Sequence, residues 1–257
     1  MTRAGAVSLP ILTFHALDGE GDVGALPPQV FREGISHMHR QGFRTLDLAD
    51  AVAMLRNGDA LPPRAVVLTF DDGYRSVYTE ALPVLQEYGM TATVFLAVGA
   101  PEEPAAHDRL PSLLGREMLR WHEIREMARA GIAFGAHSLT HADLTRLPGD
   151  RLETEVCRSR TIIEQHLGSA VPGFAYPFGR YDRRSYALVR QHFDFACSDI
   201  FALASYASDP WALERVDMFY FRGRRRFVLV VSRWLPVMVC AIAAPRRLRR
   251  SVLSLIE

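Results

Sequence analysis

Short apolar runs and amphipathic segments alternate along the chain between residues 9 and 217. The apolar runs are rich in β-branched residues and predict buried strands over residues 9–15, 43–46, 65–70, 91–98, 132–137, 171–177, 193–198 and 212–217. Apolar residues at helical spacing predict helices between them, over residues 28–41, 49–57, 78–88, 118–130, 150–167 and 182–192. Several of these helices run into a glycine, as at Gly42, Gly58, Gly89 and Gly131.

Regular alternation of strands and helices predicts an α/β fold with parallel strands joined by right-handed crossovers. An open doubly wound sheet is compatible with this pattern, but the number of units favours a (β/α) barrel with seven or eight parallel strands. We expect the barrel to span residues 8–221 and residues 222–257 to form a basic and apolar helical tail. In either fold the active site is expected at the carboxyl ends of the strands.

Two adjacent carboxylates follow the predicted strand at residues 65–70. Asp71 and Asp72 precede Gly73, and an Asp-Asp-Gly sequence taken alone is most simply a solvated turn. Side by side in a cleft, however, the two charges would repel each other unless a cation lay beside them. His137 and His141 follow another predicted strand at metal-ligand spacing. Two imidazoles and one carboxylate would form a three-ligand metal site with an open position.

Three motifs occur in a fixed order along the chain. They are Thr69-Phe70-Asp71-Asp72-Gly73-Tyr74, His137-x-x-x-His141 and Phe174-Ala175-Tyr176-Pro177-Phe178-Gly179. Together they resemble the motifs of the polysaccharide deacetylases, carbohydrate esterase family four, and the third resembles a branch associated with exopolysaccharide biosynthesis. The resemblance covers roughly residues 10–217. It implies a distorted (β/α) barrel and metal-dependent removal of N-acetyl groups from amino sugars.

The resemblance also implies a role for individual residues. Asp72, His137 and His141 would bind a divalent metal, commonly Zn²⁺. Asp71 would be the general base that takes a proton from the attacking water. The backbone N–H of Phe178 would stabilise the oxyanion that forms on the acetyl group.

Two positions depart from the family pattern. Many members have an arginine in the third motif that holds the catalytic aspartate, and here Ala175 stands at that position. Arg180 or Arg215 is a candidate to replace it. No late Leu-x-x-His motif is present to supply a general acid. We therefore predict that His15, at the end of the first strand, protonates the leaving amine, with an ordinary buried histidine as the alternative.

Residues that contact the substrate are predicted at the same strand ends. Tyr74, Tyr176 and Arg215 lie there, and Tyr74, Tyr176, Phe178 and Trp211 are candidates to line a sugar groove. Aromatic side chains at a barrel mouth also occur for packing alone. The three cysteines, Cys157, Cys197 and Cys240, form no CxxC pair and are expected to be free thiols.

Charge is balanced over the whole chain but not along it. A formal net charge of +1 argues against a nucleic-acid binder. The resemblance implies an N-acetylated glycan or glycolipid as the partner. From Arg222 onward the chain has nine arginines and one acidic residue, Glu257, around an apolar stretch at residues 227–244. Arg233 near the middle of that stretch would cost about 2.5–3.5 kcal/mol in a bilayer, which argues against a membrane span. An interfacial helix on anionic head groups and a last barrel helix with an arginine-rich solvent face both remain open.

Residues 1–10 contain one arginine and no apolar run, so no signal peptide is expected. We therefore predict a cytoplasmic location, at the inner face of the membrane if residues 222–257 bind lipid.

Three functions follow from these observations. The first is a metal-dependent deacetylase acting on an amino sugar in a polysaccharide or its precursor. The second is an esterase or amidase of the same fold acting on a non-sugar acyl group. The third is a catalytically inactive carbohydrate-binding or scaffold protein, suggested by Ala175 and the absent late histidine.

Overall fold

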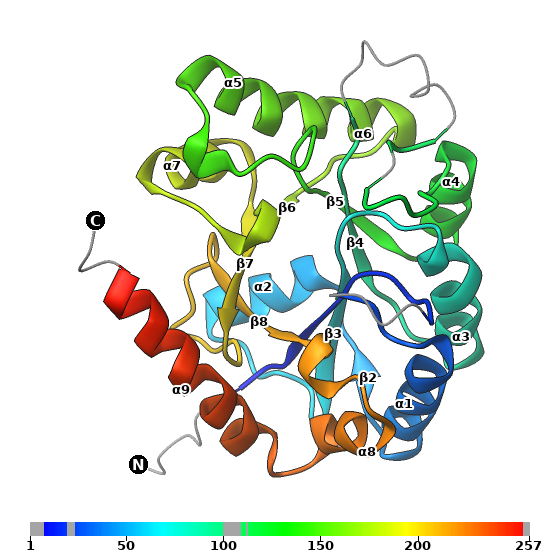
Figure 1. The fold of residues 1–257 in the computed structure, drawn as a ribbon. Helices are drawn as coiled ribbons and strands as arrows, with labels where there is room; N and C mark the ends of the chain where they lie inside the picture. Colours follow the sequence, from blue (N-terminus) through cyan, green and yellow to red (C-terminus); the bar gives the residue numbers. More distant parts are fainter. Residues whose placement is uncertain (1–7, 20–23, 100–108, 112, 254–257) are drawn as a thin grey trace.

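Seven parallel strands close into a barrel with helices around it (Figure 1). The computed structural model describes residues 8–19, 24–99, 109–111 and 113–253. Around the ring the strands run β1-β8-β7-β6-β5-β4-β3, and pairing of β3 with β1 closes it. They are β1 (Ile11–Phe14), β3 (Ala65–Phe70), β4 (Thr93–Leu96), β5 (Ala133–Ala136), β6 (Gly173–Ala175), β7 (Phe195–Phe201) and β8 (Leu213–Asp217). The predicted distorted (β/α) barrel is confirmed.

The eighth strand, β2 (Arg44–Thr45), lies outside the ring. It pairs with β3 only, through two residues, and Arg44 is exposed. β1 instead takes the place beside β3, with four residues in register from Ile11↔Val67 to Phe14↔Phe70. The pairing buries all four residues of β1, whereas β2 is too short and too polar to be a barrel wall.

The predicted helices form with small changes at their ends. They are α1 (Pro28–Arg40), α2 (Leu48–Asn57), α3 (Leu82–Glu87), α4 (Trp121–Arg129), α5 (Gly149–Glu153), α6 (Ser159–Leu167) and α7 (Arg183–His192). The Asp47 side chain caps α2 by accepting from the backbone of Ala49 and Asp50, and Gly58 ends it with φ +74°. A π-helical turn, η1 (Val77–Ala81), precedes α3, and a second, η4 (Thr154–Arg158), joins α5 to α6.

Helix α2 covers the amino end of the barrel. Its buried residues Leu48, Val52 and Leu55 belong to the same apolar cluster as Phe95 and Cys197 on the barrel strands. Figure 1 shows α2 behind the strands as the barrel is viewed. Because α2 closes this end, the opposite end, where the strands finish, is the one left for a pocket.

The basic segment from residue 222 begins as part of the outer layer of the barrel. It forms α8 (Arg224–Phe227), a 3₁₀ turn η7 (Val228–Val231) and α9 (Leu235–Leu253). Phe227 is 1% exposed and its ring centroid lies 6.3 Å from that of Phe14. A Cβ added to Gly34 of α1 would lie 2.2 Å from the Phe227 ring, so a glycine there makes room for it. Residues 222–245 are therefore packed on the barrel rather than detached from it.

The segment at residues 99–115 connects β4 to α4, and its residues 100–108 and 112 lie outside the described part of the chain. Its described part is not all at the surface. Leu110 is buried, and a Cβ on Gly73 would lie 2.7 Å from its Cδ1. This contact explains the glycine after Asp72, whose backbone also has φ +86°.

Candidate active site

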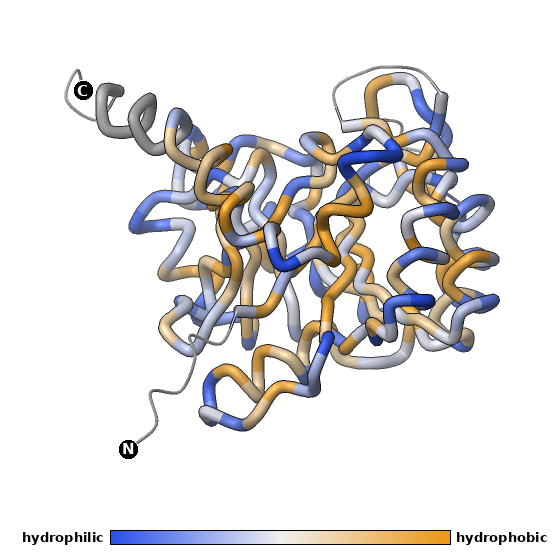
Figure 2. The backbone as a smooth tube through the Cα atoms, turned by 90° about the horizontal axis from the view of Figure 1, so that it is seen from below, coloured by the Kyte–Doolittle hydropathy of each residue, from blue (hydrophilic) through white to orange (hydrophobic). Residues whose placement is uncertain are grey.

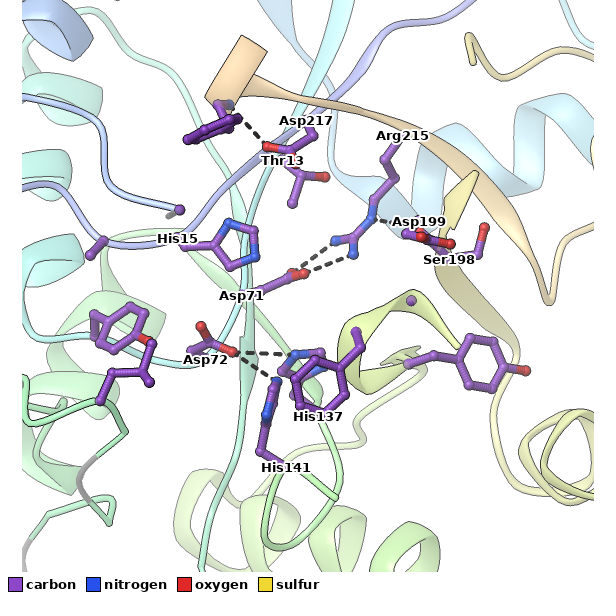
Figure 3. A pocket seen from close by; sticks show the side chains of 18 of the residues that line it. Thr13, His15, Asp71, Asp72, His137, His141, Ser198, Asp199, Arg215 and Asp217 are labelled. Carbon is purple, nitrogen blue, oxygen red and sulfur yellow. Dashed lines mark hydrogen bonds and ion pairs between the residues drawn. The ribbon is translucent and has the colours of Figure 1, made fainter. Parts of the chain in front are cut away.

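A pocket of about 390 Å³ opens at the carboxyl ends of the strands (Figure 3). Nine of the residues predicted to act in catalysis, substrate binding or metal binding line it: His15, Asp71, Asp72, Tyr74, His137, His141, Tyr176, Phe178 and Arg215. The barrel topology brings them together, because parallel strands all end at the same edge. Within the pocket they form two clusters, one around Asp72 and one around Asp71.

Asp72, His137 and His141 converge on one point in the pocket. The Oδ1 atom of Asp72 lies 3.4 Å from Nε2 of His137 and 3.3 Å from Nε2 of His141. The candidate ligand atoms of the three residues all lie within 4.8 Å of one another. These separations suit ligands that each sit about 2.0–2.2 Å from a shared metal ion.

Hydrogen bonding around the three residues favours a cation between them. The Oδ1 atom of Asp72 is buried and has no hydrogen-bond partner. Nδ1 of His137 lies 2.7 Å from the carbonyl oxygen of Ala175, which can only accept, so Nδ1 carries the hydrogen. In neutral His137 the lone pair of Nε2 then faces the Asp72 carboxylate, which is repulsive unless a cation lies between them. The residues therefore fit a divalent metal site.

Burial and neighbouring charges set the ionisation of the three candidate ligands. Burial alone would raise the pKa of Asp72, but His137 and His15 outweigh it and hold the pKa well below its usual range. Burial and the adjacent His137 lower the pKa of His141 to about 4, so this imidazole is neutral at neutral pH. A carboxylate and a neutral imidazole are the forms that bind metals.

The backbone around the site adopts conformations that are uncommon for residues with side chains. Four of the six non-glycine residues with positive φ among the described residues lie here: Asp72 (+74°), Ser138 (+64°), His141 (+57°) and Phe178 (+58°). Each such residue is about 1–3 kcal/mol less favourable than one in an ordinary conformation. The surrounding contacts hold them there, which aims both the Asp72 and His141 side chains into the pocket (Figure 3).

Asp71 is held by a buried arginine. Arg215 donates from Nη1 to Oδ1 of Asp71 at 2.8 Å and from Nη2 to Oδ2 at 2.7 Å, and the two side chains are 6% and 4% exposed. Its Nε also donates to the carbonyl oxygen of Ser198. Burial raises the pKa of Asp71, but the Arg215 guanidinium outweighs this and keeps the pKa below its ordinary value. Asp71 is therefore ionised at neutral pH.

The geometry gives Arg215 a different role from the predicted contact with substrate. It lines the pocket, but both of its terminal nitrogens donate to Asp71, so it positions Asp71 from β8 and takes the place of the arginine absent at Ala175. Arg180, the other candidate for that role, is 59% exposed and pairs with Asp143 at 3.0 Å instead. Contact of Arg215 with substrate stays a prediction.

The predicted general acid His15 and two of the predicted sugar contacts, Tyr74 and Phe178, all line the pocket. Figure 3 shows His15 facing Asp71 and Asp72. Tyr74 lines the pocket, and burial together with the Asp72 carboxylate raises its pKa, so its phenol stays protonated. Phe178 is 56% exposed, and its ring centroid lies 4.6 Å from that of His141.

Tyr176 does not fit its predicted role in substrate binding. Its side chain is fully buried, and its hydroxyl donates to the carbonyl oxygen of Trp211 at 3.1 Å. The ring forms part of the pocket wall while the hydroxyl is used in packing. Trp211 is not among the residues that line the pocket; its indole stacks with Arg56 and Arg190 on the outside of the barrel.

One buried carboxylate near the site was missed from the sequence. Glu155 is 1% exposed and accepts hydrogen bonds from the backbone of Leu139 (2.9 Å) and Thr140 (2.8 Å) and from the Thr140 hydroxyl (2.6 Å). It therefore ties down the loop between the two histidines. The π-helical turn η4 presents Glu155 to this loop. The signal in the sequence was a Glu next to Val156 on the apolar face of the predicted helix.

We expect the replacement Glu155→Ala to weaken metal binding by about 10- to 100-fold, as loss of an outer contact to a ligand typically does. The loop that carries His141 would lose all three bonds that Glu155 accepts. Competition with a metal-chelating dye measures the effect. Glu153→Ala, an exposed change on the same helix, is the matched control. Equal metal affinity in the two variants would show that Glu155 does not position the ligand loop.

Comparison with known proteins was made on both sequence and structure. A family model described as polysaccharide deacetylase matches residues 58–193. The putative polysaccharide deacetylase YxkH of Bacillus subtilis (strain 168) is 29% identical over 177 residues, which cover 69% of this chain and 59% of that protein. The poly-beta-1,6-N-acetyl-D-glucosamine N-deacetylase of Escherichia coli (strain K12) is 36% identical over 103 residues, covering 38% of this chain and 15% of that protein. The chain thus spans less than two thirds of the length of either relative.

The fold has a close match among solved structures. The structure of Streptococcus pyogenes deacetylase PplD in complex with acetate superposes with a TM-score of 0.77 at 24% identity, over 88% of this chain and 99% of that chain. At this identity the match speaks for the fold alone. The family model, by contrast, covers more than half of the sequence, including the Asp-Asp-Gly, His-x-x-x-His and Pro-Phe-Gly motifs. The chain belongs to the polysaccharide deacetylase family.

Proposed function

We propose that this protein is a metal-dependent hydrolase that removes the N-acetyl group from an amino sugar in a polysaccharide or its precursor. The observation that carries the proposal is the pairing of two carboxylates with different surroundings in one open pocket. Asp72 faces two histidines, and Asp71 is held ionised by Arg215 beside them. One carboxylate can therefore bind a metal while the other accepts a proton. Metal-dependent hydrolysis of an amide uses both of these functions.

Asp72, His137 and His141 would hold the metal. The proposed metal is Zn²⁺, which accepts mixed nitrogen and oxygen ligands and leaves a coordination position open. When bound, the metal would polarise the acetyl carbonyl and lower the pKa of a water molecule. The remaining chemistry falls to the residues of the chain.

Asp71 would act as general base. Each of its oxygens accepts one bond from Arg215, which leaves a second lone pair on each oxygen to take a proton. The Arg215 contact also fixes the direction of these lone pairs. The carboxylate is therefore ready to take the proton of a water molecule as the water oxygen forms its bond to the acetyl carbon.

His15 would act as general acid when the carbon–nitrogen bond breaks. It lines the same pocket as Asp71 and stands at the end of β1. Transfer of a proton from the imidazolium to the sugar nitrogen would release a free amine, with acetate as the second product. The backbone N–H of Phe178, in the tight turn after Pro177, is the proposed donor to the oxyanion, and the exposed Phe178 ring offers a surface on which a sugar can stack.

The alternatives differ in what supports them. An inactive scaffold was suggested by Ala175 and by the absent late histidine. Arg215 holds Asp71 from another strand, which removes the first reason, and the proposed acid His15 would answer the second. An esterase or amidase acting on a non-sugar acyl group would use the same residues, so only the substrate separates it from the deacetylase. The relatives named as poly-beta-1,6-N-acetyl-D-glucosamine N-deacetylases favour the amino sugar.

Acetate release across a panel of acetylated compounds tests the substrate class. The panel should contain oligomers of N-acetylglucosamine, O-acetylated xylo-oligomers and a simple non-sugar acetyl ester. We expect turnover mainly on the N-acetylated oligomers. Turnover confined to the esters would support the esterase, and none on any compound by the metal-loaded protein would support the scaffold.

We expect His15→Gln to slow acetate release by about 100-fold or more, because general acid catalysis typically contributes that much. Metal content should be unchanged, since His15 is not one of the three converging ligands. His37→Gln, on the outer helix α1, is the control for the loss of an imidazole. Full turnover by His15→Gln would rule out His15 as the acid.

A further inference from the structure

The helical segment at residues 222–245 has an apolar outer face. Among residues 235–245 of α9, whose side chains are described, the buried ones are Leu235, Val239 and Ala243, at intervals of four residues. The outward positions are exposed and carry no charge: Pro236, Val237, Cys240, Ala241, Ala244 and Pro245. A surface helix of a globular domain normally places polar side chains outward. Figure 2 shows residues 235–245 mostly in hydrophobic colours.

Large apolar side chains gather on this segment. Val228, Trp234 and Val237 are 38%, 54% and 58% exposed. They make up half of the large hydrophobic residues that are exposed in the described part of the chain, and of the others Leu114 and Phe178 line the catalytic pocket. We call Val228, Trp234, Val237 and the exposed positions of α9 the apolar face.

Arginines surround the apolar face. Those whose side chains are described are all exposed: Arg222, Arg224, Arg225, Arg226 and Arg233. No acidic residue occurs between Arg222 and Pro245, and four more arginines follow within the next five residues of the sequence. The ion pair that the structure shows for this group joins Arg224 to Glu33 at 3.0 Å. The positive charge therefore favours an anionic partner, and the exposed tryptophan and valines favour an apolar one. A partner that fits this segment should have both properties.

The shape of the segment suits a surface. No single helix in the described ranges is long and apolar enough to cross a membrane. Taken together, the pieces Arg224–Val231 and Leu235–Pro245 are long and apolar enough for a span, but the chain bends by 115° between them. A segment bent this sharply suits the surface of a bilayer better than its interior. Arg233 and Trp234 lie at this bend, with the Arg233 guanidinium 5.3 Å from the Trp234 ring centroid. Tryptophan and arginine side by side are typical of the head-group region of a bilayer.

The segment also begins at the wall of the pocket. Phe219 and Tyr220 line the pocket, and the Arg222 guanidinium lies 4.5 Å from the centroid of the Phe219 ring. The apolar face is thus connected to the catalytic end of the barrel by only a few residues.

We propose that residues 222–245 dock the protein on the surface of an anionic lipid bilayer. The apolar face enters the boundary between head groups and acyl chains, and the arginines bind the lipid phosphates. An amphipathic helix with arginines at its polar margins binds in this way without spanning. The proposal stands apart from the catalytic one, because it uses none of the residues in the pocket.

Vesicle flotation with the full chain tests the proposal. We expect the protein to float with vesicles of mixed phosphatidylcholine and phosphatidylglycerol and to stay at the bottom with phosphatidylcholine alone. Raising the salt concentration should weaken the binding, because the arginines act through screened charge. The double change Arg225→Glu with Arg226→Glu should lower the partition coefficient by about tenfold or more. The double change Trp234→Ser with Val237→Ser should lower the partition coefficient by a similar factor, because less apolar surface would enter the bilayer.

The matched control reverses the charge of two exposed arginines elsewhere on the protein. It combines Arg151→Glu in α5 with Arg183→Glu in α7. Figure 1 shows these helices at the opposite end of the molecule from α8. This control has the same net charge as the Arg225/Arg226 variant and should bind vesicles like the unchanged protein. Thermal unfolding of each variant shows that the fold is kept, as expected for exposed positions.

Three results would overturn the proposal. The first is no flotation with anionic vesicles. The second is equal loss of binding in the control, which would mean that net charge alone attracts the protein. The third is a dimer seen by light scattering that Trp234→Ser with Val237→Ser dissociates, in protein that does not bind vesicles. In that case a second copy of the chain covers the apolar face.

Discussion

Replacing Asp71 with Asn is expected to leave the metal in place and to slow acetate release by about 10²–10⁴-fold, the usual contribution of a general base. Asn has nearly the same shape, but its amide cannot take a proton from water. Asp71 is also not one of the three residues whose ligand atoms converge. Acetate release and metal content after dialysis, measured on the same preparation, give the two numbers that are needed.

The neighbouring change is the control. Asp72→Asn should lose metal and turnover together, because the unpartnered Oδ1 of Asp72 is the proposed carboxylate ligand. Two adjacent residues of the same type would then fail in different ways. If Asp71→Asn lost the metal and Asp72→Asn kept it, the assigned roles would be reversed.

Replacing Arg215 with Met should destabilise the protein by about 3–5 kcal/mol, the usual effect of removing one partner of a buried ion pair. Asp71 would remain buried without its two hydrogen bonds. Burial raises the pKa of Asp71, and without Arg215 only the nearby His137 and His15 would oppose it. The pKa should therefore rise, so that the acid limb of turnover moves to higher pH. Denaturant unfolding and a pH–rate profile measure the two effects.

The double variant Arg215→Met with Asp71→Asn separates the ion pair from packing. With both charges removed, most of the lost stability should return, because no uncompensated charge is left in the barrel. Turnover should stay low, since the base is gone. If the double variant were as unstable as Arg215→Met alone, the loss would come from the packing of the arginine side chain.

The metal site was predictable because its residues follow directly from topology. Asp72 and His137 each end a buried apolar run, and parallel strands carry such ends to one edge. His141 lies four residues beyond His137, within reach of the same point. Local sequence patterns and the rule about strand ends predicted two histidines beside one of two adjacent carboxylates. The family resemblance was needed to choose Asp72 over Asp71.

The partner of Asp71 was beyond the reach of local patterns. Arg215 is 144 residues away, and its contact depends on β1 lying between β3 and β8 in the ring. That order in turn requires β2 to stay outside, whereas the sequence predicted a strand at residues 43–46 without placing it. The sequence shows that Arg215 lies in a predicted strand near its end. Whether its side chain faces Asp71 or a substrate depends on the register between strands that are far apart in the sequence.

Glu155 and Phe227 show two further reasons for missing contacts. Glu155 reaches the ligand loop from a π-helical turn, and a regular 3.6-residue pattern does not predict such a turn. Phe227 lies at the start of a segment that was read as a tail, yet it fills the space left by Gly34 of α1. Binding of the apolar face of that segment to a membrane, like the cytoplasmic location, stays a prediction.

The most direct test of the central claim is acetate release from N-acetylglucosamine oligomers by protein that has been stripped with a chelator and then reloaded. We predict no release from the stripped protein and full recovery on addition of stoichiometric Zn²⁺ or another divalent metal, with no recovery in the Asp72→Asn variant. Release that continued unchanged in the stripped protein, with metal confirmed absent, would contradict the account.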